Sequence, residues 1–152
     1  MTDSPSSRWR DPALRTVWKQ RYDQGYFETA GGGLRLEFVR RAEIEKLILE
    51  FATGHPALSK SQVRRFFQHC RWIEHQLKSH SRTWAQLQPE IHRLDRVAAD
   101  AAAKPKIPES FHEFVEWNVQ ACRSESDFVD GFLPHFEAVL GFGANQLKDE
   151  GR

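Results

Sequence analysis

The sequence predicts an all-α protein, a compact bundle of five to six helices. Apolar residues recur at steps of three and four along most of the chain, whereas no segment shows the alternating pattern of a β-strand. The 152 residues include eleven Phe and five Trp, and this apolar content indicates a folded, globular domain with one core.

The predicted domain organisation has three parts. An N-terminal extension, partly flexible, occupies residues 1–24, a helical bundle occupies residues 25–143, and a polar tail occupies residues 144–152. The first ten residues are rich in Ser and are expected to be flexible. Trp9 lies in this stretch and is interpreted as a docking anchor.

The first helices follow from capping residues and apolar spacing. Asp11 and Pro12 suit the cap and the first position of a short helix, which we expect to run to about Arg21. The first long helix is expected from about Leu36 to Phe51, because apolar residues form a continuous stripe in its second half.

The second long helix has the clearest start. Ser59 and Gln62 form the pattern of a capping box, in which each side chain bonds to the backbone N–H of the other residue. The remaining helices are expected to begin near Thr83, Glu109 and Ser126. Pro134 is expected to kink the last one.

Charge is distributed unevenly, although the formal net charge is only +1. Residues 55–82 carry six Lys and Arg against one acidic residue, whereas residues 109–152 carry three against nine. A polyanion is therefore attracted to the middle of the chain and repelled by its last quarter.

The basic residues of the second long helix fall on one side of it. At 100° per residue, six of them lie within a stripe of about 60°, separate from the apolar side and about 33 Å long. They are Lys60, Arg64, Arg71, His75, Lys78 and Arg82. Arg65 and Trp72 point elsewhere and could contact a second strand, a neighbouring subunit or another helix.

A straight row of cations can follow successive phosphates of a nucleic acid without reading its bases. A row of Lys and Arg is also common on an ordinary solvated helix. A third interpretation is a helical protein–protein adaptor, whose basic helix docks on an acidic partner surface such as the acidic last quarter of a second copy.

No group of residues assembles into a catalytic or metal site. The residues that could bind a metal are densest at His69, Cys70, His75 and His80. Their side chains point in different directions around the helix, so they cannot converge on one ion. Glu113 and Glu116 are interpreted as solvated surface. We therefore expect no catalytic residue, no metal, no cofactor and no enzyme activity.

The sequence predicts a cytoplasmic protein. It lacks an apolar stretch long enough to span a membrane, and its N-terminus does not read as a secretory signal. Cys70 and Cys122 do not form a disulfide framework, which is typical of a reducing compartment.

Several segments, taken in their order along the chain, resemble the small subunit of the type III-A CRISPR effector, the Csm complex. The most specific is Leu58-Ser59-x-Ser61-Gln62-x-Arg64-x-Phe66. The others are Gly25-Tyr26-Phe27, Leu34-Arg35-Leu36-Glu37-Phe38-Val39, Leu87-x-Pro89-x-Ile91 and Phe132-x-x-x-Phe136-Glu137-Ala138-Val139. The resemblance covers about residues 25–142.

The resemblance implies a non-catalytic subunit for antiviral defence that contacts the backbone of crRNA and target RNA without reading sequence. Copies of it would associate as dimers or stack as an inner filament, beside the backbone subunits and the large polymerase-like subunit. The motif places Lys60, Gln62, Arg64 and Arg65 at the RNA, and Arg71 and Lys78 extend their face. His75 and Arg82 complete the predicted RNA-binding set by helical spacing.

Overall fold

The computed structural model describes residues 9–29 and 32–149, and within them the chain is all-α. Six α-helices follow one another: α1 (Pro12–Gln24), α2 (Arg41–Thr53), α3 (Lys60–Lys78), α4 (Trp84–Ala103), α5 (Glu109–Ala121) and α6 (Leu133–Gly143). A short 3-10 helix η2 (Leu36–Phe38) precedes α2, and a π-helical segment η3 (Asp127–Phe132) precedes α6. The prediction of an all-α bundle is confirmed.

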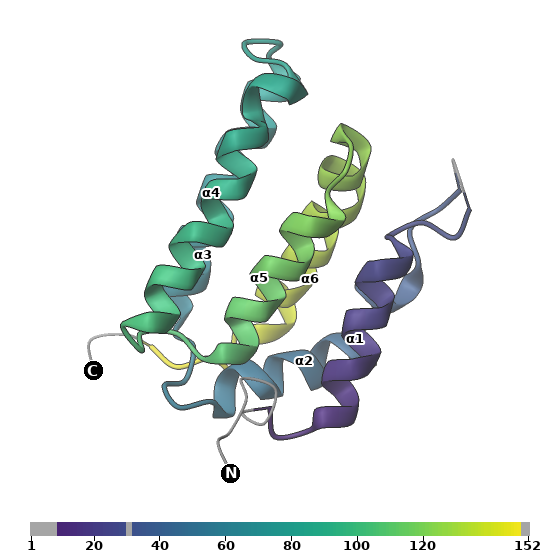
Figure 1. The fold of residues 1–152 in the computed structure, drawn as a ribbon. Coiled ribbons are helices and arrows are strands. Elements are labelled where there is room, and N and C mark those ends of the chain that lie inside the picture. Colours follow the sequence, from purple (N-terminus) through teal and green to yellow (C-terminus); the bar gives the residue numbers. More distant parts are fainter. Residues whose placement is uncertain (1–8, 30–31, 150–152) are drawn as a thin grey trace.

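The helices form neighbouring pairs (Figure 1). The two longest helices, α3 and α4, make a hairpin that projects beyond the others, and α4 packs against α5. Helix α6 packs against α2, α3 and η3, while α1 packs against α5 on the side away from the hairpin. The hairpin therefore offers a long outer surface at one edge of the molecule.

Aromatic rings fill the centre of the bundle. Phe51 of α2 meets Phe111 edge-on at 5.3 Å and Phe114 at 5.4 Å between ring centroids. Phe114 also lies 5.6 Å from Phe136 of α6. Each of these four side chains is at most 1% exposed, so one core connects α2, α5 and α6.

The caps predicted at Asp11 and Ser59 are confirmed, whereas Ser126, predicted with Asp127 as a possible cap of the last helix, forms no side-chain cap. The Asp11 carboxylate accepts hydrogen bonds from the backbone N–H groups of Ala13 and Leu14 at the start of α1. Ser59 and Gln62 form the capping box that begins α3, with the Ser59 N–H donating to Gln62 Oε1 at 3.0 Å. Helix α1 runs to Gln24, three residues further than predicted.

We expect Ser59→Ala to lower the free energy of unfolding by about 1 kcal/mol, because the Gln62 backbone N–H loses its acceptor at the helix start. Chemical denaturation measures this loss. Ser79→Ala is the matched control, because Ser79 is exposed at the other end of α3 and its loss should cost little. Equal losses in the two variants would contradict the role assigned to the cap.

The predicted helix from Leu36 to Phe51 is wrong in its first part. The 3-10 helix ends at Phe38, and Arg40 is extended with a ψ of 134° before α2 begins at Arg41. Two bonds from the Arg40 guanidinium to Glu43, of 2.8 and 2.9 Å, fasten this break to the first turn of α2.

The last predicted helix is divided rather than kinked in its interior. Residues 127–132 form the π-helical segment, which continues directly into α6, and Pro134 lies at this junction as the second residue of α6. Tyr26 packs so closely on Gly131 that a Cβ there would lie 2.5 Å from the Tyr26 ring. Close packing by a residue from the other end of the chain thus coincides with the change of helix type.

The expected flexibility of residues 1–10 is wrong at Trp9, whereas residues 1–8 lie outside the described part of the chain. The Trp9 side chain is 2% exposed and stacks on Trp117 of α5 at 5.9 Å. Within residues 9–29 and 32–149, none of the helices is both long and apolar enough to cross a bilayer.

Candidate nucleic-acid interface

Helix α3 carries seven of the eight predicted RNA-binding residues. Five of them are exposed to solvent: Arg64, Arg65, Arg71, His75 and Lys78. Lys60 and Gln62, in the first turn, are partly buried. At about 1.5 Å per residue, the basic row from Lys60 to Lys78 is about 27 Å long.

Arg82 does not continue this row, so the predicted length of the stripe is wrong. Helix α3 ends at Lys78, and His80 adopts a left-handed φ of 58° that turns the chain towards α4. The Arg82 guanidinium instead lies over the Trp72 ring, 5.4 Å from its centroid. Arg82 is thereby placed on the side of α3 that carries Trp72.

Two carboxylates lie against the basic row. Glu74 pairs with Lys78 at 2.9 Å and with Arg71 at 3.1 Å. Asp149 lies 3.4 Å from the Lys60 ammonium, and the Lys148 carbonyl accepts the Lys60 backbone N–H at 2.9 Å. Because Arg71, Lys78 and Asp149 are mostly exposed, these pairs are weak and can exchange with another anion.

Gln62 and Arg64 differ in availability. The Gln62 amide donates to the Lys106 carbonyl at 2.6 Å, and its oxygen caps Ser59, so its side chain is held within the fold. Arg64 is exposed beside a hollow of about 220 Å³ that α6 helps to line. Arg64 is therefore the clearest free donor on the basic row.

Arg65 lies about 100° around α3 from Arg64. On that side α3 and α4 line a groove of about 330 Å³. The groove has an apolar floor that includes Phe66, Leu94 and Val97, and Val97 is 45% exposed. Basic side chains line it from three segments: Arg65 from α3, Arg93 from α4 and Lys106 from the loop that follows. Sequence spacing did not reveal this groove, because no motif links the three cations.

An aromatic surface continues the groove along α3. The His69 and Trp72 rings stack at 5.9 Å with an angle of 17° between their planes. His69 also lines the groove, and Trp72 is 38% exposed. Trp72, predicted with Arg65 to contact a second strand, a neighbouring subunit or another helix, thus lies on the groove side together with Arg65 and Arg82.

A comparison with family models places this chain. The family model of Csm2 Type III-A matches residues 42–144. The chain belongs to the Csm2 family. It is therefore a small subunit of the type III-A Csm complex, as the motif around Ser59 had indicated. Comparisons with curated proteins and with solved structures found no match.

The part that matches Csm2 runs from the first turn of α2 to the residue after α6. It contains the whole α3–α4 hairpin and therefore both the basic row and the groove. Trp9 and α1 lie outside it and are attached to it by a buried polar cluster.

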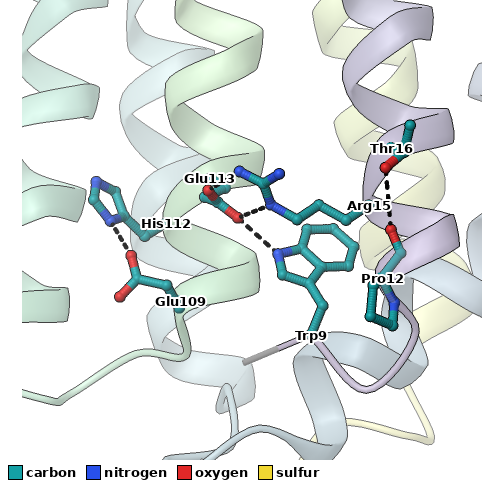
Figure 2. Close-up of polar contacts among 7 residues, drawn as sticks. All are labelled: Trp9, Pro12, Arg15, Thr16, Glu109, His112 and Glu113. Carbon is teal, nitrogen blue, oxygen red and sulfur yellow. Dashed lines mark hydrogen bonds and ion pairs between the residues drawn. The ribbon is translucent and has the colours of Figure 1, made fainter. Parts of the chain in front are cut away.

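That cluster centres on Glu113 of α5 (Figure 2). The Glu113 carboxylate accepts hydrogen bonds from Trp9 Nε1 at 2.7 Å and from Arg15 Nε and Nη2 at 3.0 and 2.7 Å. Glu113 is 7% exposed, so its interpretation as solvated surface is wrong. Its two hydrogen-bond donors lie 98 and 104 residues before it in the sequence. A local sequence pattern cannot reveal contacts over such separations.

A second buried polar site joins α1 to α6. His135 of α6 is fully buried, with Nδ1 2.6 Å from the Phe38 carbonyl and Nε2 2.7 Å from the Tyr22 hydroxyl. Burial lowers the pKa of His135 to about 4. The imidazole is therefore neutral at physiological pH and joins two elements as a structural hydrogen-bonding group.

Among the described residues, no three His, Cys, Asp or Glu side chains are grouped to hold a metal ion. Cys70 is buried in the core, where burial raises the pKa of its thiol, and it forms no bond to Cys122.

Proposed function

We propose that this Csm2-family chain is a non-catalytic subunit that holds the backbone of crRNA and target RNA independently of sequence. The observation that carries the proposal is the exposed row on α3, where Arg64, Arg71 and His75 face solvent side by side. Phosphate oxygens accept hydrogen bonds from Arg guanidinium and Lys ammonium groups, whatever base the nucleotide carries. The subunit would act in the cytoplasm in antiviral defence.

Family membership supports an assembly with other Csm subunits, which would include the large polymerase-like subunit and the backbone subunits. Copies of the chain would associate as dimers or stack as an inner filament along the RNA. The projecting hairpin suits this arrangement, because its outer row is long enough to meet several phosphates.

Salt dependence tests the proposal. We expect the affinity for single-stranded RNA to fall with salt at a log–log slope of about −2, which corresponds to about three phosphate contacts. Replacing Arg64 and Arg71 together by Glu should weaken binding by at least about tenfold at ~0.1 M salt and flatten the slope. Fluorescence anisotropy over a salt series measures both quantities.

The matched control reverses two exposed charges outside α3, at Arg41 and Arg123, and makes the same change in net charge. It should weaken binding far less than the α3 variant. An equal loss in both variants would show that net charge, rather than the α3 row, sets the affinity. Binding that does not respond to salt would contradict backbone contact altogether.

A protein–protein adaptor is the second candidate. The observation that favours it is that Glu74 and Asp149 already lie against Lys60, Arg71 and Lys78, as the carboxylates of an acidic partner would. In that case the α3 variant should lose a protein partner from the Csm complex and keep its affinity for RNA.

A further inference from the structure

We propose that the groove between α3 and α4 receives an unpaired base of the RNA strand whose backbone lies on α3. This inference rests on the proposed function, since it assumes that RNA lies on the exposed face of α3. It adds a second site, with a different chemistry from the basic row. The row would hold phosphates, and the groove would distinguish single-stranded from duplex RNA.

The groove suits a planar aromatic ring, such as a nucleobase, that is attached to an anionic group, such as a phosphate. Its floor is apolar, and its volume of about 330 Å³ lies at the lower end of the range for small-molecule sites. Arg65, Arg93 and Lys106 surround that floor from three separate segments. None of the described residues that line the groove carries a carboxylate.

An acid of α4 that contacts two residues of the groove is already engaged. Glu90 of α4 lies 3.4 Å from His69 Nε2 and 3.8 Å from Arg93, and its backbone carbonyl lies 3.1 Å from the same His69 nitrogen. Within the described part of the chain, Arg65 and Lys106 form no ion pair. Two cations at the groove are therefore available to an incoming phosphate, in contrast to Lys60, Arg71 and Lys78 on the row.

The groove is continuous with the basic row across the exposed face of α3. Arg64 of the row and Arg65 of the groove are consecutive, and Gln68, Arg71 and Trp72 continue the exposed face between the two sides. Glu74 lies on the edge of the row away from the groove. Its position on the helix is about 180° from that of Arg65. A strand on the row can thus reach the groove without passing a carboxylate of α3.

Flat side chains favour RNA over an acidic peptide as the occupant. The His69–Trp72 stack and the Arg82 guanidinium form a surface of rings and a planar cation beside the groove. Sites for single-stranded nucleic acid combine a cationic groove with such stacking surfaces. In a duplex the bases are stacked and paired, so they cannot enter the groove.

Arg64 and Arg65 provide a matched pair of variants for the test, because they are consecutive, both exposed and on different sides of α3. The full-length protein is titrated with a single-stranded RNA and with a duplex of the same length. Arg65→Glu should weaken single-stranded binding by about tenfold and duplex binding by less than about twofold. Arg64→Glu should weaken both.

A charge-neutral variant tests the floor of the groove. Val97→Gln changes an exposed position to a polar one and should weaken single-stranded binding severalfold while duplex binding stays unchanged. Thermal unfolding of each variant checks that the fold is retained.

Each other outcome overturns the inference in a recognisable way. If Arg65→Glu weakens the binding of both RNAs equally, the groove cations contribute only to the overall electrostatic attraction. If neither Arg65→Glu nor Val97→Gln affects RNA binding, the groove belongs to an acidic protein partner or to no ligand. If Arg64→Glu also leaves both RNAs unaffected, the proposed function fails together with the inference.

Discussion

Protonation of His135 should destabilise the protein by about 3 kcal/mol when the pH falls from 7 to 4. The pKa of His135 is about 4 in the folded protein, whereas a histidine in an unfolded chain titrates near 6.5. Between these values the unfolded state binds a proton that the folded state excludes. Stability is therefore fully present above about pH 6.5 and is lost as the pH falls towards 4.

The physical cause is the surroundings of the imidazole. Complete burial disfavours the charged ring, and a Tyr22 hydroxyl that donates to Nε2 requires that nitrogen to be unprotonated. Chemical denaturation at a series of pH values measures the loss. His135→Gln should flatten the pH dependence between 4 and 6.5, whereas His75→Gln, at an exposed position, should preserve it. A slope that survives in His135→Gln would contradict the assignment.

Glu113→Ala should lower the free energy of unfolding by about 2–3 kcal/mol, because it removes the acceptor of three hydrogen bonds at once. Trp9 Nε1 would be left buried without a partner, and Arg15 would lose both bonds of its fork. The hydrogen bond to Glu113 also raises the pKa of Arg15.

Glu116→Ala is the control for this prediction, since Glu116 lies one turn further along α5 and is half-buried rather than buried. Its loss should cost less than about 1 kcal/mol. Limited proteolysis adds a second measurement, because Glu113→Ala should release the Trp9 segment from α5 and expose it to cleavage. Equal stability of the two variants would contradict the role of Glu113 as the attachment point.

Local patterns in the sequence predict much of the bundle. Asp11 and the Ser59–Gln62 box begin their helices as expected, because capping depends only on neighbours in sequence. The sequence also predicts the basic row of α3, since its cations share one side of a single helix. It does not predict the position of Arg82, because the left-handed turn at His80 ends the helix first.

Several contacts that the sequence does not predict join distant parts of the chain. Glu113 looked solvated because its partners Trp9 and Arg15 come from the N-terminal segment. Asp149 reaches Lys60, and Lys106 and Arg65 line the same groove, only because the helices pack as they do. Such pairings follow from tertiary packing, and hydrophobic spacing within one helix carries no information about them.

We propose α3 as the surface that holds RNA. Photo-crosslinking of the assembled type III-A complex with its guide and target RNA, followed by mass spectrometry of this subunit, tests it most directly. We predict RNA adducts on peptides of α3, between Lys60 and Lys78. Adducts confined to other helices, with α3 crosslinked only to neighbouring protein subunits, would contradict the claim and support the adaptor instead.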